Sequence, residues 1–191
     1  MAKLYFRHGT MGSAKTLNLL AVAHNYRQQG KRVALLKPRL DDRFGKATIA
    51  SRAGLEADAD VLLGPDDRLD PRSFDGVDCV LVDEVQFLSP RIIEDLRRLT
   101  KDPGVPVICY GLRTDFKTRL FDGSRRLVEL ADSIEEVKVT CQFCNRKAIL
   151  NMRFVDGVPT RKGAQVALGA EEMYAPVCYG CYADRLPIDD A

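Results

Sequence analysis

Short apolar runs alternate with amphipathic stretches in the first part of the chain, and this alternation predicts an α/β fold. The aromatic and aliphatic run at 3–7 is followed by a loop that begins at Gly9, and then by a helix-like stretch at 15–29. Gly30 is well placed to end that helix, and the apolar run at 32–36 then predicts a second strand. A strand, a helix and a second strand in this order are typical of a parallel βαβ unit.

The alternation resumes after a polar interval. Asp, Arg and Gly are frequent from 40 to 75, which predicts mostly loop. The run at 80–82 is aliphatic throughout and suits a central strand that is covered on both faces. Further elements are predicted in chain order: a helix at 89–100 that begins with Ser89 and Pro90, a strand at 105–110, a helix at 124–131 and a strand at 137–139. Residues 1–140 are therefore predicted to form one α/β domain with a parallel sheet flanked by helices.

The pattern changes at residue 141. Residues 141–191 carry turn signals and short alternating segments rather than helical periodicity. They also contain two CxxC pairs, Cys141 with Cys144 and Cys178 with Cys181, separated by 33 residues. Four thiolates bind Zn²⁺ tetrahedrally and leave no ligand position open, so this spacing predicts a structural zinc site in a small zinc-ribbon-like lobe. The alternative is that the four are unconnected core cysteines.

Composition limits the class of protein. With 191 residues, of which 46% are hydrophobic, the chain is long enough for one well-buried core with a small addition. A formal charge of +2, with no long run of one sign, does not favour nucleic acid as a partner. The apolar stretch at the N-terminus is too short for a signal peptide or a membrane span, so we expect no membrane partner and a cytoplasmic location. The cysteines should then be reduced, and Cys79 and Cys109 are predicted to be buried packing residues in strands.

One segment predicts phosphate binding. Residues 9–16, GTMGSAKT, fit the pattern GxxxxGK followed by Ser or Thr, except that Ala14 replaces the second glycine. In such a loop, backbone N–H groups and the positive end of the following helix hold phosphate oxygens. Lys15 would reach the β- and γ-phosphates and Thr16 would bind Mg²⁺, so the expected ligand is a nucleoside triphosphate. The candidate residues are Gly9, Thr10, Met11, Gly12, Ser13, Ala14, Lys15 and Thr16. The alternative is a glycine-containing turn with a lysine at the start of a helix.

An acidic pair follows the predicted central strand. Asp83 is placed to hold Mg²⁺ opposite the phosphate loop, and Glu84, where the chain turns, is placed to face the substrate. A general base at Glu84 could take the proton of an attacking hydroxyl group. The combination predicts phosphoryl transfer, but it does not separate a kinase from an ATP hydrolase, because a hydrolase would use the same glutamate on water. Taken singly, the two residues could also be a turn-forming aspartate and a solvated carboxylate.

Taken in order, several segments resemble those of the cytosolic-type thymidine kinases. They are GTMGSAKT at 9–16, DDRF at 41–44, DEVQF at 83–87, CYGLRTDF at 109–116, the paired cysteines, and QVALGAEEMY at 165–174. The resemblance covers nearly the whole chain. It implies a P-loop NTPase-type α/β domain at 1–140 joined to a zinc-stapled lobe at 141–191, whose lasso-like loop closes the nucleoside site. It further implies ATP, Mg²⁺, deoxythymidine as the acceptor and a homo-tetramer.

The resemblance also implies roles for individual residues. Glu84 would be the catalytic base that deprotonates the 5′-hydroxyl of the nucleoside. Residues expected near ATP and Mg²⁺, besides the phosphate loop, are Asp41, Arg43, Asp83 and Gln86. Residues expected around the nucleoside are Met11, Phe87, Leu112, Phe116, Phe121 and Tyr174, with main-chain hydrogen bonds from Gln165, Val166, Ala167, Leu168 and Gly169. Without the resemblance, the segment at 41–44 is a solvated charged loop, and Phe116 and Phe121 are ordinary packing residues.

Two residues depart from the family pattern. Ala14 must tolerate a backbone conformation that usually belongs to glycine. Asn151 stands where some relatives have a small hydroxyl residue near the base, so that contact is left open. A second hypothesis for the whole chain is an ATP-switched protein that binds nucleic acid through its zinc module. The low net charge and the apolar residues at 109–121 favour the kinase, because they suit a small flat ligand better than a row of phosphates.

Overall fold

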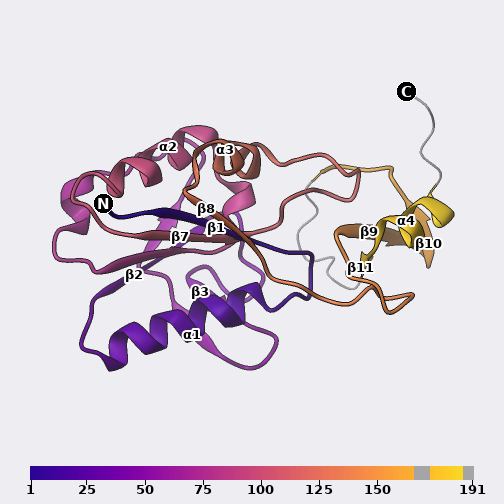
Figure 1. The fold of residues 1–191 in the computed structure, drawn as a ribbon, viewed down its shortest axis with the longest axis horizontal. Coiled ribbons are helices and arrows are strands. Elements are labelled where there is room, and N and C mark those ends of the chain that lie inside the picture. Colours follow the sequence, from indigo (N-terminus) through magenta and orange to yellow (C-terminus); the bar gives the residue numbers. More distant parts are fainter. Residues whose placement is uncertain (166–172, 187–191) are drawn as a thin grey trace.

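A computed structural model of the chain describes residues 1–165 and 173–186. A six-stranded sheet in the order β5-β2-β6-β7-β1-β8 forms the middle layer of the larger part of the molecule, between α1 and the pair α2 and α3 (Figure 1). All neighbouring strands pair in parallel. The strands are β1 (Leu4–His8), β2 (Val33–Pro38), β5 (Val61–Leu63), β6 (Cys79–Val82), β7 (Val107–Gly111) and β8 (Ser133–Glu136). The predicted α/β class with a parallel sheet is confirmed.

Helices cover both faces of this sheet. Helix α1 (Lys15–Gln28) packs Leu19 and Leu20 against one face, beside Leu81 of the central strand. On the other face lie α2 (Pro90–Leu99) and α3 (Asp122–Leu130), together with apolar side chains of β1 and β6 (Figure 1). Both faces of β6 are therefore covered, which accounts for its continuous run of apolar residues. Cys79 and Cys109 are fully buried in β6 and β7, as predicted.

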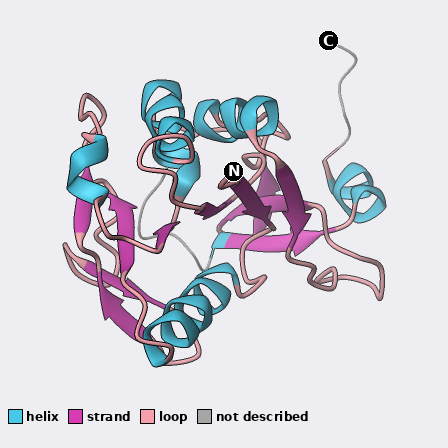
Figure 2. Cartoon of the chain, turned by 60° about the vertical axis from the view of Figure 1, so that its left-hand side comes forward, coloured by secondary structure: helices cyan, strands magenta, loops and turns pink. Residues whose placement is uncertain are grey.

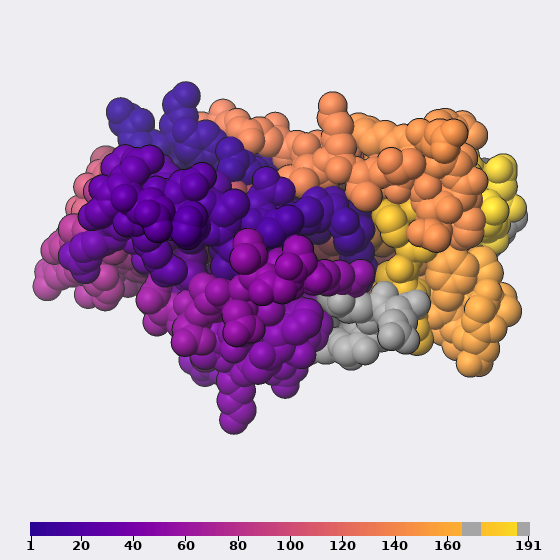
Figure 3. Space-filling model, turned by 90° about the horizontal axis from the view of Figure 1, so that it is seen from below, coloured from indigo at the N-terminus to yellow at the C-terminus, as the bar shows by residue number. Residues whose placement is uncertain are grey.

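The C-terminal lobe, residues 141–165 and 173–186, has its own small core. It contains a three-stranded antiparallel sheet in the order β10-β9-β11 and one short helix. The elements are β9 (Leu150–Val155), β10 (Val158–Thr160), β11 (Tyr174–Val177) and α4 (Tyr179–Arg185). Asp156 and Gly157 both have positive φ angles, 51° and 76°, and form the tight turn between β9 and β10 that their sequence predicts. In Figure 3 this lobe, in orange and yellow, occupies one end of the molecule.

The interval at 40–75 is mostly loop, as predicted, but it also holds the hairpin β3 (Thr48–Ala50) and β4 (Glu56–Asp58), the edge strand β5 and a 3₁₀ turn, η1 (Pro71–Phe74) (Figure 2). Two other expectations about secondary structure were wrong. The strand after α3 is β8 rather than 137–139, because the polar stretch at 133–136 pairs with the edge of β1. The last segment is helical in α4, where the Cys178 sulfur accepts the N–H of Cys181 and caps the first turn.

Candidate functional site

The phosphate loop at 9–16 connects the end of β1 to the start of α1, as its sequence predicts. Because the strands are parallel, the ends of β1, β6 and β7 meet at the same edge of the sheet, where such folds bind ligands. Gly12 (φ 73°) and Ala14 (φ 62°) both adopt left-handed backbone conformations. The two residues therefore bend the loop around the N-terminal end of the helix.

Ala14 carries a strain that glycine would not. An L-residue in the left-handed region costs about 1–2 kcal/mol relative to its ordinary conformation, and glycine is nearly free of this cost. We therefore expect Ala14→Gly to raise the free energy of unfolding by about 1 kcal/mol and to leave activity equal or higher. Urea unfolding of the two proteins measures the difference. The matched control is Ala21→Gly in the middle of α1, which should lower stability by about 0.5–1 kcal/mol. A loss of stability in Ala14→Gly would show that the loop depends on the alanine methyl group.

Lys15 folds back onto the loop that precedes it. Its Nζ donates to the carbonyl oxygen of Thr10 at 2.6 Å and to the Ser13 hydroxyl at 3.3 Å. The side chain is buried, and this burial lowers the pKa of the ammonium group. The negative charges of Glu84 and Asp83 act in the other direction and raise it, but by less. A buried cation held in this way is ready to exchange these neutral partners for a phosphate.

The acidic pair lies directly opposite the loop. Asp83 follows β6 and accepts a hydrogen bond from the Thr16 hydroxyl at 3.0 Å. Burial, and then the negative charge of Glu84, raise the pKa of Asp83 to about 7. Glu84 has φ 47° and ψ 37°, so the chain turns sharply there. The two carboxylates bind different partners, Asp83 the Thr16 hydroxyl and Glu84 the side chains of Arg43 and Gln86. The arrangement brings together a hydroxyl group and a buried carboxylate, the ligand types that Mg²⁺ prefers.

Glu84 is held by two donors. Arg43 Nη2 donates to its Oε1 and Gln86 Nε2 donates to its Oε2, each at 2.5 Å. Arg43 also pairs with Asp41 at 2.6 Å, and Asp41 in turn lies 3.4 Å from the ammonium group of Lys37. Burial opposes the ionisation of Asp41, but the hydrogen bond and charge of Arg43 outweigh it and hold the pKa of Asp41 below its usual range. The segment at 41–43 is thus part of the site rather than a solvated loop.

One cavity of about 260 Å³ joins these groups to the apolar residues that the family resemblance implies. Its lining includes the predicted residues Met11, Gly12, Ser13, Ala14, Lys15, Thr16, Asp41, Arg43, Asp83, Glu84, Gln86, Phe87, Leu112, Phe116, Phe121, Gln165 and Tyr174. Gly9 and Thr10 line a second, smaller pocket that shares Asn151 with the first. The predicted residues Val166, Ala167, Leu168 and Gly169 lie outside the described part of the chain.

Two aromatic pairs wall the apolar part of the cavity. Phe87 and Phe121 meet edge to face with ring centres 5.9 Å apart, and Phe116 and Tyr174 are tilted at 6.1 Å. Gln86, besides its bond to Glu84, accepts the backbone N–H of Leu112 at 2.9 Å. A flat, uncharged ring would fit such walls, since aromatic faces supply stacking and the buried amide and backbone groups supply fixed polar contacts.

The contact of Asn151, which the sequence left open, is made to the phosphate loop. Asn151, on β9, accepts the backbone N–H of Met11 at 2.8 Å and so ties the C-terminal lobe to this loop. Several other lining residues were not predicted as site residues. Asp115 accepts the backbone N–H groups of Lys117 and Arg119, and its other oxygen accepts the Gln165 amide at 3.0 Å. The remaining unpredicted residues are Leu17, Phe44, Ile49, Ala50, Ser51, Arg52 and Ala53. Most of these belong to the β3 region, which its composition presents as loop.

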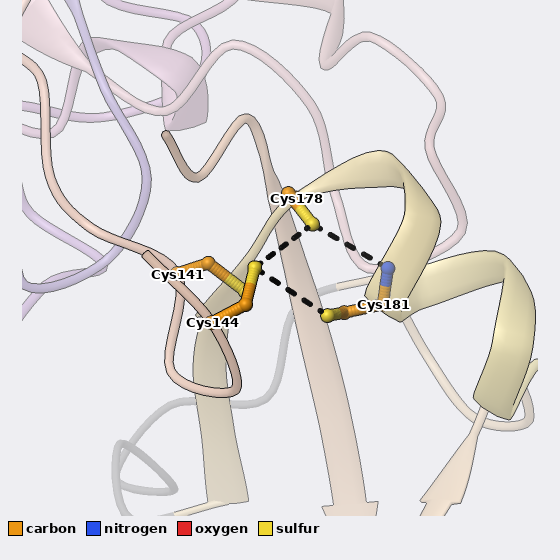
Figure 4. A group of neighbouring side chains, drawn as sticks. All are labelled: Cys141, Cys144, Cys178 and Cys181. Atoms are coloured by element: carbon orange, nitrogen blue, oxygen red, sulfur yellow. Dashed lines mark hydrogen bonds between the residues drawn. The ribbon is translucent and has the colours of Figure 1, made fainter. Parts of the chain in front are cut away.

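The four cysteines of the two CxxC pairs converge in the C-terminal lobe (Figure 4). Their sulfur atoms all lie within 4.8 Å of one another, and Cys144 is 3.7 Å from Cys178 and 3.8 Å from Cys181. Four sulfurs at Zn–S distances of about 2.3 Å in a tetrahedron lie about 3.8 Å apart, so the cluster fits Zn²⁺. Backbone N–H groups of Phe143 and Cys181 also donate to the sulfurs of Cys141 and Cys178 at 3.4 Å. The alternative of four unconnected core cysteines is wrong.

The parallel sheet, the phosphate loop and the opposed acidic pair define a P-loop nucleotide-binding protein with a small four-cysteine lobe. The family described as thymidine kinase matches residues 2–182, and the chain belongs to the thymidine kinase family. It is therefore a kinase, and the family match does not favour the second hypothesis of a nucleic-acid-binding switch.

Relatives with known names agree with this assignment. The chain is 44% identical over 185 residues to the thymidine kinase of Lactococcus lactis, covering 93% of this chain and 95% of the relative. It is also 44% identical to a thymidine kinase of Streptococcus thermophilus, with 93% and 92% covered. Among solved structures, Bacteroides Pif1 bound to ssDNA matches with a TM-score of 0.43 and 17% identity, covering 71% of this chain and 38% of that protein, a likeness too distant to carry an argument. Within the described residues, no helix has the length and apolar character needed to cross a membrane.

Proposed function

We propose that this protein is an ATP-dependent thymidine kinase, which transfers the γ-phosphoryl group of ATP to the 5′-hydroxyl of deoxythymidine. The observation that supports this most directly is that a single cavity is lined by the phosphate loop, by Glu84 and by the aromatic walls. The phosphate donor and the hydroxyl acceptor would therefore bind side by side in the same cavity. Positioning of this kind is the main contribution of the protein to phosphoryl transfer.

The donor half of the site would consist of the loop at 9–16 and its surroundings. Backbone N–H groups of the loop would cradle the phosphates, and Lys15 would leave its contacts with Thr10 and Ser13 to bind the β- and γ-phosphates. Thr16 and Asp83 would hold Mg²⁺, which when bound offsets the charge of the triphosphate. Burial, and then the charge of Glu84, raise the pKa of Asp83, and a cation at this point would favour its ionised form.

The acceptor half would use Glu84 as general base. Its carboxylate takes the proton of the 5′-hydroxyl as the oxygen forms its bond to the γ-phosphorus and the bond to the leaving ADP breaks. In the present arrangement Arg43 and Gln86 occupy both oxygens of this carboxylate. We propose that Arg43 turns towards the phosphates when they arrive, which would release Glu84 for the nucleoside and place a positive charge beside the transferring group.

The pyrimidine would lie between the aromatic pairs, with Met11 and Leu112 completing the apolar slot. Main-chain groups from Gln165 to Gly169, in the lasso-like part of the 141–191 lobe, would read the edge of the base. Zn²⁺ on the four cysteines would be structural, because four thiolates leave no open ligand position. We also propose that the chain consists of two domains, at 1–140 and 141–191, that it assembles as a homo-tetramer and that it is located in the cytoplasm.

An ADP-release assay with a panel of nucleosides tests this proposal. With ATP and Mg²⁺ present, deoxythymidine should stimulate ADP release strongly, and purine nucleosides should not. Metal analysis of the same sample should give one Zn²⁺ per chain. Absence of stimulation by every pyrimidine nucleoside would contradict the kinase. Salt-sensitive binding of single-stranded DNA without nucleoside-dependent ADP release would instead support the nucleic-acid-binding hypothesis.

A further inference from the structure

Tyr182 connects the four-cysteine cluster to the wall of the cavity. It directly follows Cys181 on α4, and its side chain is fully buried in the core of the C-terminal lobe. In that core it packs with Leu150, Met152 and Val177, which come from the two longer strands of the lobe. Any shift of the cluster that moves α4 must therefore also move this ring, because a close-packed core leaves it no free space.

The hydroxyl group of Tyr182 reaches out of the lobe. It donates to the backbone carbonyl of Phe116 at 2.6 Å, across 66 positions of sequence. On its other side it accepts a hydrogen bond from Arg161 Nε at 3.2 Å. Arg161 is itself fixed, because its second nitrogen donates to the Leu186 carbonyl at 2.7 Å and its guanidinium lies over the Tyr182 ring, 5.3 Å from the centre. Ring and hydroxyl are thus held in one orientation.

Phe116 is the cavity residue at the far end of this connection. Only 2% of it is exposed, and its ring lies against Tyr174 and under the guanidinium of Arg153, 5.2 Å away. The preceding residue, Asp115, holds the Gln165 amide. The backbone carbonyl that Tyr182 binds therefore belongs to a segment that sets the position of an aromatic wall and of Gln165, a polar residue that lines the cavity.

We propose that Tyr182 is a positioning residue that couples the metal state of the four cysteines to the binding of the nucleoside. This rests on the proposed function, which supplies deoxythymidine as the occupant of the slot beside Phe116. Binding of the nucleoside stabilises the Phe116 wall, the wall holds Tyr182, and Tyr182 holds the turn of α4 that carries Cys178 and Cys181. Such coupling is reciprocal in binding free energy, so deoxythymidine raises the affinity for Zn²⁺ by the same factor by which Zn²⁺ raises the affinity for deoxythymidine. Tighter binding of the metal should appear as slower loss of Zn²⁺ when deoxythymidine is bound.

Tyr182→Phe isolates the connection, because it removes one oxygen atom and keeps the buried ring. The matched control is Tyr179→Phe, on the same helix and directly after Cys178, whose side chain is largely exposed. Four quantities are measured for each protein: zinc content, KM for deoxythymidine, KM for ATP, and the half-time of zinc transfer to a chromogenic chelator with and without saturating deoxythymidine.

Wild type and Tyr179→Phe should release zinc several-fold more slowly when deoxythymidine is bound. Tyr182→Phe should contain the same zinc, show a KM for deoxythymidine raised by about fivefold or more with an unchanged KM for ATP, and lose most of the protection by deoxythymidine. Arg161→Gln serves as a second variant. It leaves the tyrosine in place and removes one partner of its hydroxyl, so it should shift both quantities in the same direction by a smaller amount.

Equal protection in wild type and Tyr182→Phe would overturn the inference. So would a parallel rise in KM for both substrates, which indicates a general structural role. If wild type phosphorylates deoxythymidine but the nucleoside gives no protection against zinc loss, the coupling fails while the proposed function stands. If wild type does not phosphorylate deoxythymidine, the proposed function fails first, and protection of the zinc by the nucleoside still decides the coupling.

Discussion

Replacing Glu84 with glutamine is expected to lower kcat for deoxythymidine by about 10²- to 10⁴-fold, the usual contribution of a positioned general base. Glutamine has nearly the same shape and can still contact Arg43 and Gln86, but it cannot take a proton from the 5′-hydroxyl. Binding of deoxythymidine and of ATP, measured by calorimetry, should change by only a few-fold. The effect should therefore lie in turnover and not in affinity.

A neutral substitution elsewhere controls for the loss of a carboxylate. Glu94→Gln removes a charge on α2 that pairs with Arg126 and does not line the cavity, so its kcat should match wild type. Full turnover by Glu84→Gln would exclude Glu84 as the base. A loss of ATP affinity equal to the loss of kcat would instead assign Glu84 to the organisation of Arg43 and the phosphates.

The second large effect is expected at Lys15. Lys15→Met should lower kcat/KM for ATP by about 10²- to 10³-fold, because the loop loses the cation that stabilises charge on the transferring group. The stability of the folded protein, in contrast, should not fall. Since burial already disfavours the charged ammonium, replacing it with an apolar side chain of similar length should leave the melting temperature equal or slightly higher.

Thermal unfolding and ADP release on the same preparations separate these two effects. The matched control is Lys31→Met. Lys31 is exposed, lies just beyond the C-terminal end of α1 and places its ammonium group over the Tyr26 ring, so its replacement should change neither quantity by much. A sharp fall in melting temperature for Lys15→Met would mean that the contacts of Lys15 with Thr10 and Ser13 hold the substrate-free loop together, and that the ammonium group has a structural role as well.

Short sequence patterns predicted the elements whose structure depends on residues close together in the sequence. The phosphate loop, α1 and the acidic pair after β6 depend on residue types at short spacing, and the structure places them as expected. The two CxxC pairs were equally predictable, because equal spacings imply one shared ligand set. The uninterrupted aliphatic run of β6 identified a strand covered on both faces, because a strand with one solvated face would alternate apolar and polar residues.

The features that escaped prediction depend on partners distant in sequence. Strand β8 is polar, with two glutamates in a four-residue element, and only its pairing with β1 makes it a strand. Asn151 contacts Met11 from 140 positions away, and Asp115 contacts Gln165 from 50. No periodicity of hydrophobic residues encodes such contacts. The short strands β3 and β4 escaped because three residues give too little alternation to distinguish a strand from a loop.

The place of β1 in the sheet has a consequence for how the protein is made. Its neighbours are β7 and β8, so that Leu4 pairs with Val107 and Tyr5 with Ser133. Because synthesis begins at the N-terminus, β1 is made long before its partners. Its apolar residues remain unpaired until β7 has emerged from the ribosome, when more than half of the chain has been made. The phosphate loop cannot take its final form before then. A nascent chain halted before Val107 would thus expose Leu4 and Phe6 to chaperones and proteases, and nucleotide could bind only after β7 had been made.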